Sequence, residues 1–164
     1  MTQEVNAKFI KAYDELADSI FRYCYFRILN YDLAQDLVQE TFTRVWEYLA
    51  AGKEITNIRA FAYKVAKNLI IDESRKRKTM SLELLQEKGV QPKYDGKEKL
   101  YTLLHTKDII SVLEKLDGRY REVIMLRYVE EFSVKEIAEI LEETENTISV
   151  RIHRGLQKVR TIIK

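Results

Sequence analysis

Hydrophobic residues recur at steps of three and four positions along most of the chain, the spacing that places side chains on one face of an α-helix. The first stretch of this kind covers residues 9–28 and the second covers residues 33–49. Asp32, followed three positions later by Gln35, has the spacing of a capping box and is predicted to begin the second helix. Gly52 is a natural stop after it. The chain is therefore predicted to begin with two amphipathic helices.

A third helix is predicted from residue 58 to about residue 78. Asn57, a residue type favoured at helix N-caps, comes directly before it. Phe61, Val65 and Leu69 mark the side of this helix that is predicted to be buried.

The helix breakers of the chain gather near its middle. The chain has five glycines and one proline, and two of those glycines and the proline fall within residues 89–96. Because proline and glycine destabilise helix interiors, we expect a linker over residues 79–105. The predicted fold is all-α, with two small helical domains joined by this linker, residues 1–78 and residues 106–164.

The second domain carries a more specific pattern. Two amphipathic helices, separated by an Asp-Gly pair, are predicted within residues 106–128. A capping box at Ser133 and Glu136 opens a short helix, and either Thr144 or Asn146 can cap the last helix of the chain. Two helices joined by a short turn, the second rich in basic residues, are typical of a helix-turn-helix DNA-binding motif.

Composition narrows the class of protein. Hydrophobic residues make up 46% of the 164 residues and charged residues 33%, a balance that supports a buried core and is unlike that of disordered chains. The longest aliphatic runs, such as residues 69–71, are far shorter than the roughly 20 residues of a membrane span. No secretory signal is visible, and the single cysteine, Cys24, cannot form an internal disulfide. We therefore expect a cytoplasmic protein and exclude membrane-spanning, disulfide-stapled and collagen-like classes.

The net charge of +2 hides a strong segregation of charge. The charge by segment is −3 for residues 1–58, +5 for residues 59–78, 0 for residues 79–105, −5 for residues 106–145 and +5 for residues 146–164. Basic residues at the end of the last helix also complement the helix dipole. The segregation indicates two basic helices that can contact nucleic acid and acidic surfaces that can contact a protein partner.

The first basic helix also carries groups suited to bases. Tyr63 can stack on a base and Asn68 can read a base edge, while the lysines around them can bind phosphates. Asp36 and Glu40 lie one helical turn apart, but no histidine is near them, so partner binding is favoured over acid–base or metal chemistry. We predict no catalytic residue, no cofactor and no metal site, and we expect Cys24 to be a core residue.

Two blocks of this sequence resemble conserved regions of bacterial RNA polymerase sigma factors. The region 2 helix is similar to residues 36–46 (DLVQETFTRVW), and the promoter-binding helix that follows it is similar to residues 60–75 (AFAYKVAKNLIIDESR). Region 4 is similar to residues 121–123 (REV), 136–141 (EIAEIL), 147–148 (TI) and 151–156 (RIHRGL). Because the short chain has only these two blocks and a linker, it resembles the extracytoplasmic-function (ECF) group of the sigma-70 family.

The resemblance implies a non-catalytic factor that binds core RNA polymerase and directs initiation at promoters with −10 and −35 elements, with melting of the −10 element. The residues implied to bind the clamp coiled coil of the largest polymerase subunit are Asp36, Gln39, Glu40, Phe42 and Trp46. Those implied to bind the −10 element are Arg59, Tyr63, Lys64, Lys67, Asn68, Arg75 and Arg77. Those implied to bind the −35 element are Asn146, Thr147, Ser149, Arg151, His153, Arg154 and Lys158. The acidic-apolar helices of the second domain would face the flap of the second large subunit, and an anti-sigma factor is a further implied partner.

Three sites depart from the family pattern. Phe61-Ala62 stand where the family usually has Trp-Leu. Glu142-Glu143 replace the usual Gly-Ile of the helix-turn-helix turn, which removes a residue favoured for positive φ. Ser149 stands where a lysine is common, so we expect one phosphate contact fewer. These departures bear on −35 recognition more than on the −10 element.

Two other classes of protein fit the helical pattern. A homodimeric helix-turn-helix regulator would bind a palindromic site without polymerase. A helical adaptor would bind only protein and leave both basic helices as solvated surface. Basic residues concentrated on two separate helices favour two promoter elements over one palindrome.

Overall fold

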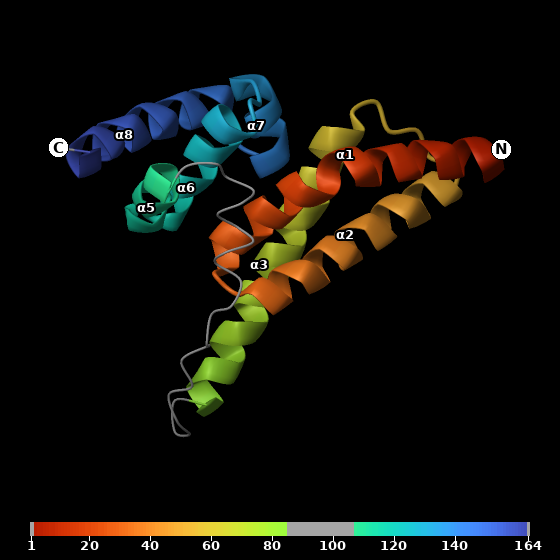
Figure 1. Cartoon of the computed structure of the whole chain (residues 1–164), viewed down its shortest axis with the longest axis horizontal. Helices are drawn as coiled ribbons and strands as arrows, with labels where there is room; N and C mark the ends of the chain where they lie inside the picture. The colour runs from red at the N-terminus through yellow and green to blue at the C-terminus, as the bar shows by residue number, and fades with distance from the viewer. Residues whose placement is uncertain (1, 85–106, 164) are drawn as a thin grey trace.

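The computed structural model describes residues 2–84 and 107–163, with side chains for residues 2–78 and 109–163, and every regular element in these ranges is a helix (Figure 1). The helices of the first domain are α1 (Thr2–Ile28), α2 (Tyr31–Ala50) and α3 (Ile58–Leu84). The helices of the second domain are α5 (Lys107–Lys115), α6 (Gly118–Ile124), the π-helical turn η1 (Met125–Val129), α7 (Val134–Leu141) and α8 (Glu145–Ile163). The predicted all-α fold with two helical domains is confirmed.

The start of α2 differs from the prediction. Asn30, with an extended backbone at φ −136°, is the N-cap residue, and its Oδ1 accepts a hydrogen bond from the N–H of Leu33 at 3.0 Å. Asp32 lies in the first turn, where its charge favours the positive end of the helix dipole. The predicted capping box at Asp32 and Gln35 is wrong because an equally good cap residue comes two positions earlier, directly after the positive-φ turn at Leu29.

The third helix begins as predicted and extends further. Asn57 Oδ1 accepts a hydrogen bond from the N–H of Ala60 at 3.0 Å, which confirms Asn57 as the cap residue. The helix runs to Leu84, so the first residues of the segment predicted as a linker are helical. The rest of the predicted linker lies outside the described residues. Gly52, with φ 75°, follows the end of α2 and confirms the predicted stop.

The capping box of the second domain is confirmed. The N–H of Glu136 donates to Ser133 Oγ at 3.1 Å, and the N–H of Ser133 donates to the Glu136 carboxylate at 2.8 Å. Thr144 caps α8, because its Oγ1 accepts the N–H of Thr147 at 3.1 Å. The helix predicted over residues 120–128 is regular only as far as residue 124 and then widens into the π-helical turn.

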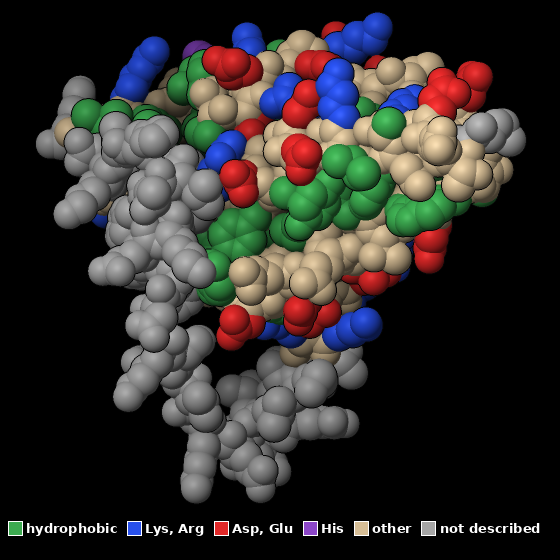
Figure 2. Space-filling view, turned by 45° about the vertical axis from the view of Figure 1, so that its right-hand side comes forward, with side chains coloured by type: hydrophobic (Ala, Val, Ile, Leu, Met, Phe, Trp, Pro, Cys, Tyr) green, Lys and Arg blue, Asp and Glu red, His purple; other side chains and the backbone are tan. Residues whose placement is uncertain are grey.

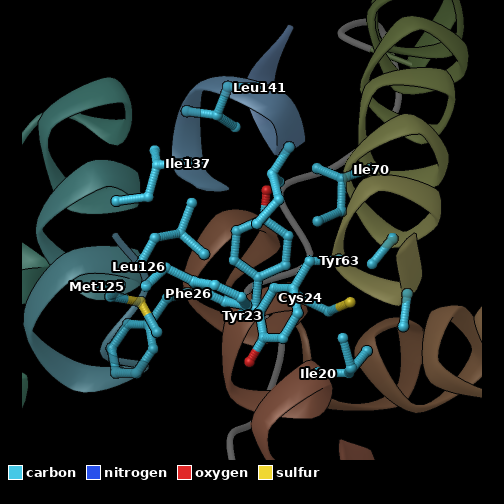
Figure 3. Packing of buried hydrophobic residues seen from close by; sticks show 14 of the residues in the cluster. Ile20, Tyr23, Cys24, Phe26, Tyr63, Ile70, Met125, Leu126, Ile137 and Leu141 are labelled. Carbon is cyan, nitrogen blue, oxygen red and sulfur yellow. The ribbon is translucent and has the colours of Figure 1, made fainter. Parts of the chain in front are cut away.

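The two domains pack against each other and share one hydrophobic core. Helix α7 lies against α3, and α6 contacts α1. Figure 3 shows Tyr23 from α1, Tyr63 from α3, Leu126 from η1 and Ile137 from α7 meeting in this core, and all four are completely buried. None of the described helices is long and apolar enough to cross a membrane. The N-terminal half of α3, around Arg59, Tyr63 and Lys67, therefore contacts the second domain.

Candidate nucleic-acid interface

The polar face of α8 is open to solvent. Six of the seven residues predicted for the −35 element are exposed, namely Asn146, Thr147, Ser149, His153, Arg154 and Lys158. The seventh, Arg151, is half-buried and forms an ion pair with Glu143 at 2.5 Å. Ile148 and Ile152 on the opposite face are buried, so packing of this face fixes the direction of the polar one.

A cleft of about 330 Å³ lies between the start of α6 and the face of α8. Its lining residues are Arg119, Tyr120, Asn146, Thr147, Val150, Arg151 and Arg154. The Arg119 guanidinium lies 5.0 Å from the centre of the Tyr120 ring, and the Lys158 ammonium lies 5.2 Å from it. Sequence reasoning missed Arg119 and Tyr120. The basic-aromatic pair could be seen in the sequence, but its position beside α8 could not.

The cleft depends on a close approach of α8 to α6 at Gly155. A Cβ atom at this position would lie 3.1 Å from Cγ1 of Ile124 and 3.7 Å from Cβ of Tyr120. A side chain at this position would require the Ile124 side chain to shift, so glycine permits the close approach of the two helices.

The residues predicted to bind the −10 element fall into two groups. Asn68, Arg75 and Arg77 occupy exposed positions on α3. The other four contact the second domain, and they are Arg59, Tyr63, Lys64 and Lys67. The structure thus leaves one part of this candidate surface open and covers the other.

The covered aromatic residue is Tyr63. Its ring centre lies 4.8 Å from that of Phe132 in an edge-on arrangement and 5.3 Å from that of Tyr23. Burial raises the pKa of the Tyr63 phenol. The Arg59 guanidinium lies 3.9 Å from the centre of the Phe132 ring and donates a hydrogen bond to the backbone carbonyl of Glu130. In this arrangement the Tyr63 ring has no free face for a base.

Lys64 and Lys67, nearly one helical turn apart, share the carboxylate of Glu142. Its Oε1 lies 3.2 Å from Lys64 Nζ, and its Oε2 lies 3.1 Å from Lys67 Nζ. The Lys67 side chain is only 7% exposed, whereas that of Lys64 is 44% exposed. Hydrogen bonds from Lys67 and Lys64 hold the pKa of Glu142 below its usual range. Glu142 itself adopts φ 56°, the positive φ for which glycine is usual at this turn.

Two other glutamates of the second domain are buried against α1. The Glu130 carboxylate receives hydrogen bonds from Arg22 Nη2 at 3.0 and 3.2 Å. Glu122 accepts a hydrogen bond from Tyr23 Oη at 2.5 Å and lies 3.4 Å from Arg27 Nε. Burial, reinforced by this carboxylate, raises the pKa of Tyr23 well above its usual value. The acidic segment of the second domain, expected to face polymerase, thus contacts the first domain over part of its surface, which sequence reasoning missed.

The exposed face of α2 carries most of the residues predicted to bind polymerase. Asp36, Gln39 and Glu40 are exposed. Trp46 is 38% exposed, whereas Phe42 is buried, with its ring centre 4.9 Å from that of Tyr13. The space-filling view shows a band of hydrophobic side chains across one face, with acidic side chains on both sides of it (Figure 2). Phe42 packs beneath the exposed face of α2 and does not form part of its surface.

Within the described ranges, no three His, Cys, Asp or Glu side chains are grouped so that they could hold a metal ion. Cys24 is fully buried, and burial raises its pKa to about 12. The thiol therefore belongs to the core, as predicted.

Comparison with known proteins places this geometry in a family. Residues 12–79 match the family model of Sigma-70 region 2, and residues 106–159 match that of Sigma-70, region 4. The chain is 32% identical over 157 residues to the ECF RNA polymerase sigma factor SigW of Bacillus subtilis, covering 90% of this chain and 84% of SigW. The chain belongs to the ECF family of RNA polymerase sigma factors.

A further relative of this sigma factor is the RNA polymerase sigma factor YlaC of Bacillus subtilis, 30% identical over 157 residues, or 89% of this chain and 90% of YlaC. Two solved structures share the fold. RpoE of Bartonella quintana, in complex with the anti-sigma factor NepR, matches with a TM-score of 0.72 and 21% identity over 95% of this chain and 96% of RpoE. CnrH in complex with the cytosolic domain of CnrY matches with a TM-score of 0.67 and 22% identity over 96% of this chain and 88% of CnrH. Members of the sigma-factor family are non-catalytic proteins that act with RNA polymerase in promoter-specific transcription initiation.

Proposed function

We propose that this sigma factor docks on core RNA polymerase through the exposed face of α2, binds the −35 element with α8, and binds and melts the −10 element with α3. The observation that carries the proposal is the presence of a basic helix face on each domain, α8 in one and α3 in the other. Two separate basic helices suit two separate promoter elements.

The α8 surface has the chemistry of major-groove recognition. Its N-terminal turn presents Asn146, Thr147 and Ser149, whose short polar groups can reach base edges and phosphates. Arg154 and Arg119 at the adjacent cleft supply cations for phosphates or guanine edges. Recognition by α8 requires no rearrangement of the domains, because this face is already exposed.

The α3 surface has the chemistry of single-strand binding. Exposed Asn68 can hydrogen-bond an extruded base, and Arg75 and Arg77 can follow the backbone. Lys64 and Lys67 would add phosphate contacts, and Tyr63 a stacking face, once the second domain moves away. We therefore propose that −10 binding accompanies separation of the two domains.

We propose the remaining partners from the acidic surfaces and the comparisons. Asp36, Gln39, Glu40 and Trp46 on α2 would contact the clamp coiled coil of the largest polymerase subunit. The second domain would contact the flap of the second large subunit when the domains are apart. The matched RpoE and CnrH structures are complexes with NepR and CnrY, which supports an anti-sigma partner for this chain. Function with polymerase would place the protein in the cytoplasm.

Transcription from a library of random promoters by bacterial core RNA polymerase, with and without the purified chain, tests this function. We expect transcripts that start at a shared sequence pattern only when the chain is present. Asn68→Ala should reduce strand opening while polymerase binding is kept, and Asn6→Ala, exposed at the start of α1, is the matched control. Absence of chain-dependent start sites would contradict the proposal.

A further inference from the structure

The proposed function does not explain why a carboxylate of the second domain, that of Glu142, pairs with two lysines of α3. We infer that Glu142 is a built-in competitor of nucleic-acid phosphate: it holds Lys64 and Lys67 in the free chain and must be displaced before α3 binds single-stranded DNA. This inference rests on the proposed function of α3.

The geometry makes the two occupants mutually exclusive. The two carboxylate oxygens of Glu142 lie 3.2 Å from Lys64 Nζ and 3.1 Å from Lys67 Nζ, so the two ammonium groups share one anion. A phosphate also presents several oxygens to such a pair of cations. A carboxylate at this position therefore occupies the place that a backbone phosphate would take.

Burial of Lys67 explains how its ion pair with Glu142 can hold the two domains together. A charged side chain that is 7% exposed is unfavourable without a partner, because an ammonium group loses its hydration on burial. Glu142 supplies the partner from the second domain. If its charge is removed, the Lys67 ammonium returns to water only when α7 and the following turn separate from α3.

The exposure of Glu142 explains how a competitor can reach the site. Its side chain is 57% exposed, so an incoming anion can approach the lysines without prior unfolding. Lys64, at 44% exposed, offers the first contact, and Lys67 becomes accessible as Glu142 leaves. The site is thus arranged for stepwise exchange of one anion for another.

A nearby carboxylate provides a control that separates the ion pairs of Glu142 from the general effect of removing one negative charge. Glu139 lies exposed on α7, three residues before Glu142, so Glu139→Gln removes the same charge from the same region. Glu143 is a poorer control because it pairs with Arg151 of the candidate −35 surface.

The first experiment measures, without DNA, how strongly Glu142 protects Lys67. The full chain is treated with an amine-acylating reagent, and the labelling rate of each lysine is followed by mass spectrometry, with exposed Lys135 as the reference. We expect slow labelling of Lys67 in the parent chain, a rise of about threefold or more in Glu142→Gln, and no change in Glu139→Gln. Glu142→Gly, which suits the positive φ at this position, should give the same rise and excludes misfolding as its cause.

The second experiment measures competition with nucleic acid. Binding of a fluorescent single-stranded oligonucleotide to the full chain is followed by anisotropy. We expect Glu142→Gln to bind about two- to fivefold more tightly than both the parent and Glu139→Gln, with the difference shrinking as salt is added. Unchanged labelling of Lys67 in Glu142→Gln, or equal gains in affinity for the two variants, would overturn the inference.

Failure of the proposed function gives a different result. If the parent chain directs specific initiation by core polymerase but the two variants behave alike, only the role of Glu142 is wrong. If the parent chain directs no initiation while Lys67 remains protected by Glu142, the DNA-binding function is wrong, and the competition is overturned with it.

Discussion

The two basic helices of this sigma factor have similar charge but very different surroundings. α8 packs its apolar side on its own domain and turns its polar face to solvent. α3 packs one side on its own domain and another on the second domain, so Tyr63 and Lys67 are buried. The same type of sequence thus gives one open and one largely covered surface. The difference arises because Phe132 and Glu142 of the second domain contact α3.

The accessibility of a charged helix in this protein therefore depends on the domain that packs against it. The second domain carries its negative charge in the segment that precedes α8. Part of that charge neutralises the first domain, with Glu122 and Glu130 buried against α1. In the free chain, the two domains therefore complement each other electrostatically, and the α8 surface and the exposed end of α3 are left for a polyanion.

Removal of the Phe132 side chain should have the largest effect on the contact between the two domains. Its ring is completely buried, lies edge-on to Tyr63 and supports Arg59, so it joins the second domain to α3. We expect Phe132→Ala to lower the free energy of unfolding by about 3–5 kcal/mol. Urea denaturation measures the loss, and small-angle scattering should show a larger radius of gyration as α3 is uncovered.

The matched control for this variant is Tyr128→Ala, which truncates a 53% exposed ring of the same region. We expect it to change the unfolding free energy by no more than about 0.5 kcal/mol. Equal losses in the two variants would mean that the Phe132 contact does not hold the domains together.

Tyr23→Phe should have a smaller effect on the same interface. The Tyr23 hydroxyl donates to the buried carboxylate of Glu122 at 2.5 Å, and its removal leaves that carboxylate with one hydrogen bond fewer. We expect a loss of about 1–3 kcal/mol in the free energy of unfolding, measured by urea denaturation. Tyr13→Phe, at a ring that is 44% exposed, is the control and should be close to neutral. Indistinguishable curves for the two variants would contradict a stabilising role for this bond.

Much of the fold within each domain could be predicted from the sequence. The three- and four-residue spacing located the helices, and local side chains identified the caps at Asn57 and Ser133. For the last helix they left Thr144 and Asn146 as alternatives, and Thr144 is the cap. These features depend on residues close to each other in the chain. The wrong cap at Asp32 shows the limit of that reasoning, because Asn30 and Asp32 are equally suitable and the turn at Leu29 decides between them.

The contact between the domains could not be predicted in the same way. Glu122 and Glu130 have the sequence appearance of solvated charges, since their partners Tyr23 and Arg22 lie about a hundred positions away. Phe132 stands alone between polar residues, outside any periodic stripe. The exposure of the candidate residues on α8 follows from the periodicity of one helix, whereas the exposure of those on α3 depends on long-range packing.

Arg119→Ala should weaken binding of duplex DNA to the exposed α8 surface. Arg119 lines the cleft beside α8 and lies over Tyr120, so it can contribute a phosphate contact without any domain movement. We expect duplex binding at the −35 element to weaken by about fivefold and the salt dependence to fall by roughly one ion. Arg160→Ala removes the same charge from α8 outside this cleft and is the control. Equal losses in fluorescence anisotropy assays would mean that only net charge matters.

The smallest predicted effect is on the loss of folding stability at acidic pH. The N–H of Ser133 donates to Glu136, and this bond holds the pKa of Glu136 below its usual range at the start of α7, the helix that covers α3. Because the pKa is depressed in the folded state, the stabilisation is fully present above the ordinary carboxyl pKa and is lost as pH falls through the folded value. Glu136→Gln keeps the capping bond but cannot titrate, so we expect it to lose about 0.5 kcal/mol less than the parent between neutral and acidic pH. Urea denaturation at both pH values measures this difference, which Glu139→Gln should leave unchanged. Parallel losses in the parent and in Glu136→Gln would show that the cap of α7 does not contribute to the acid sensitivity of the covered surface.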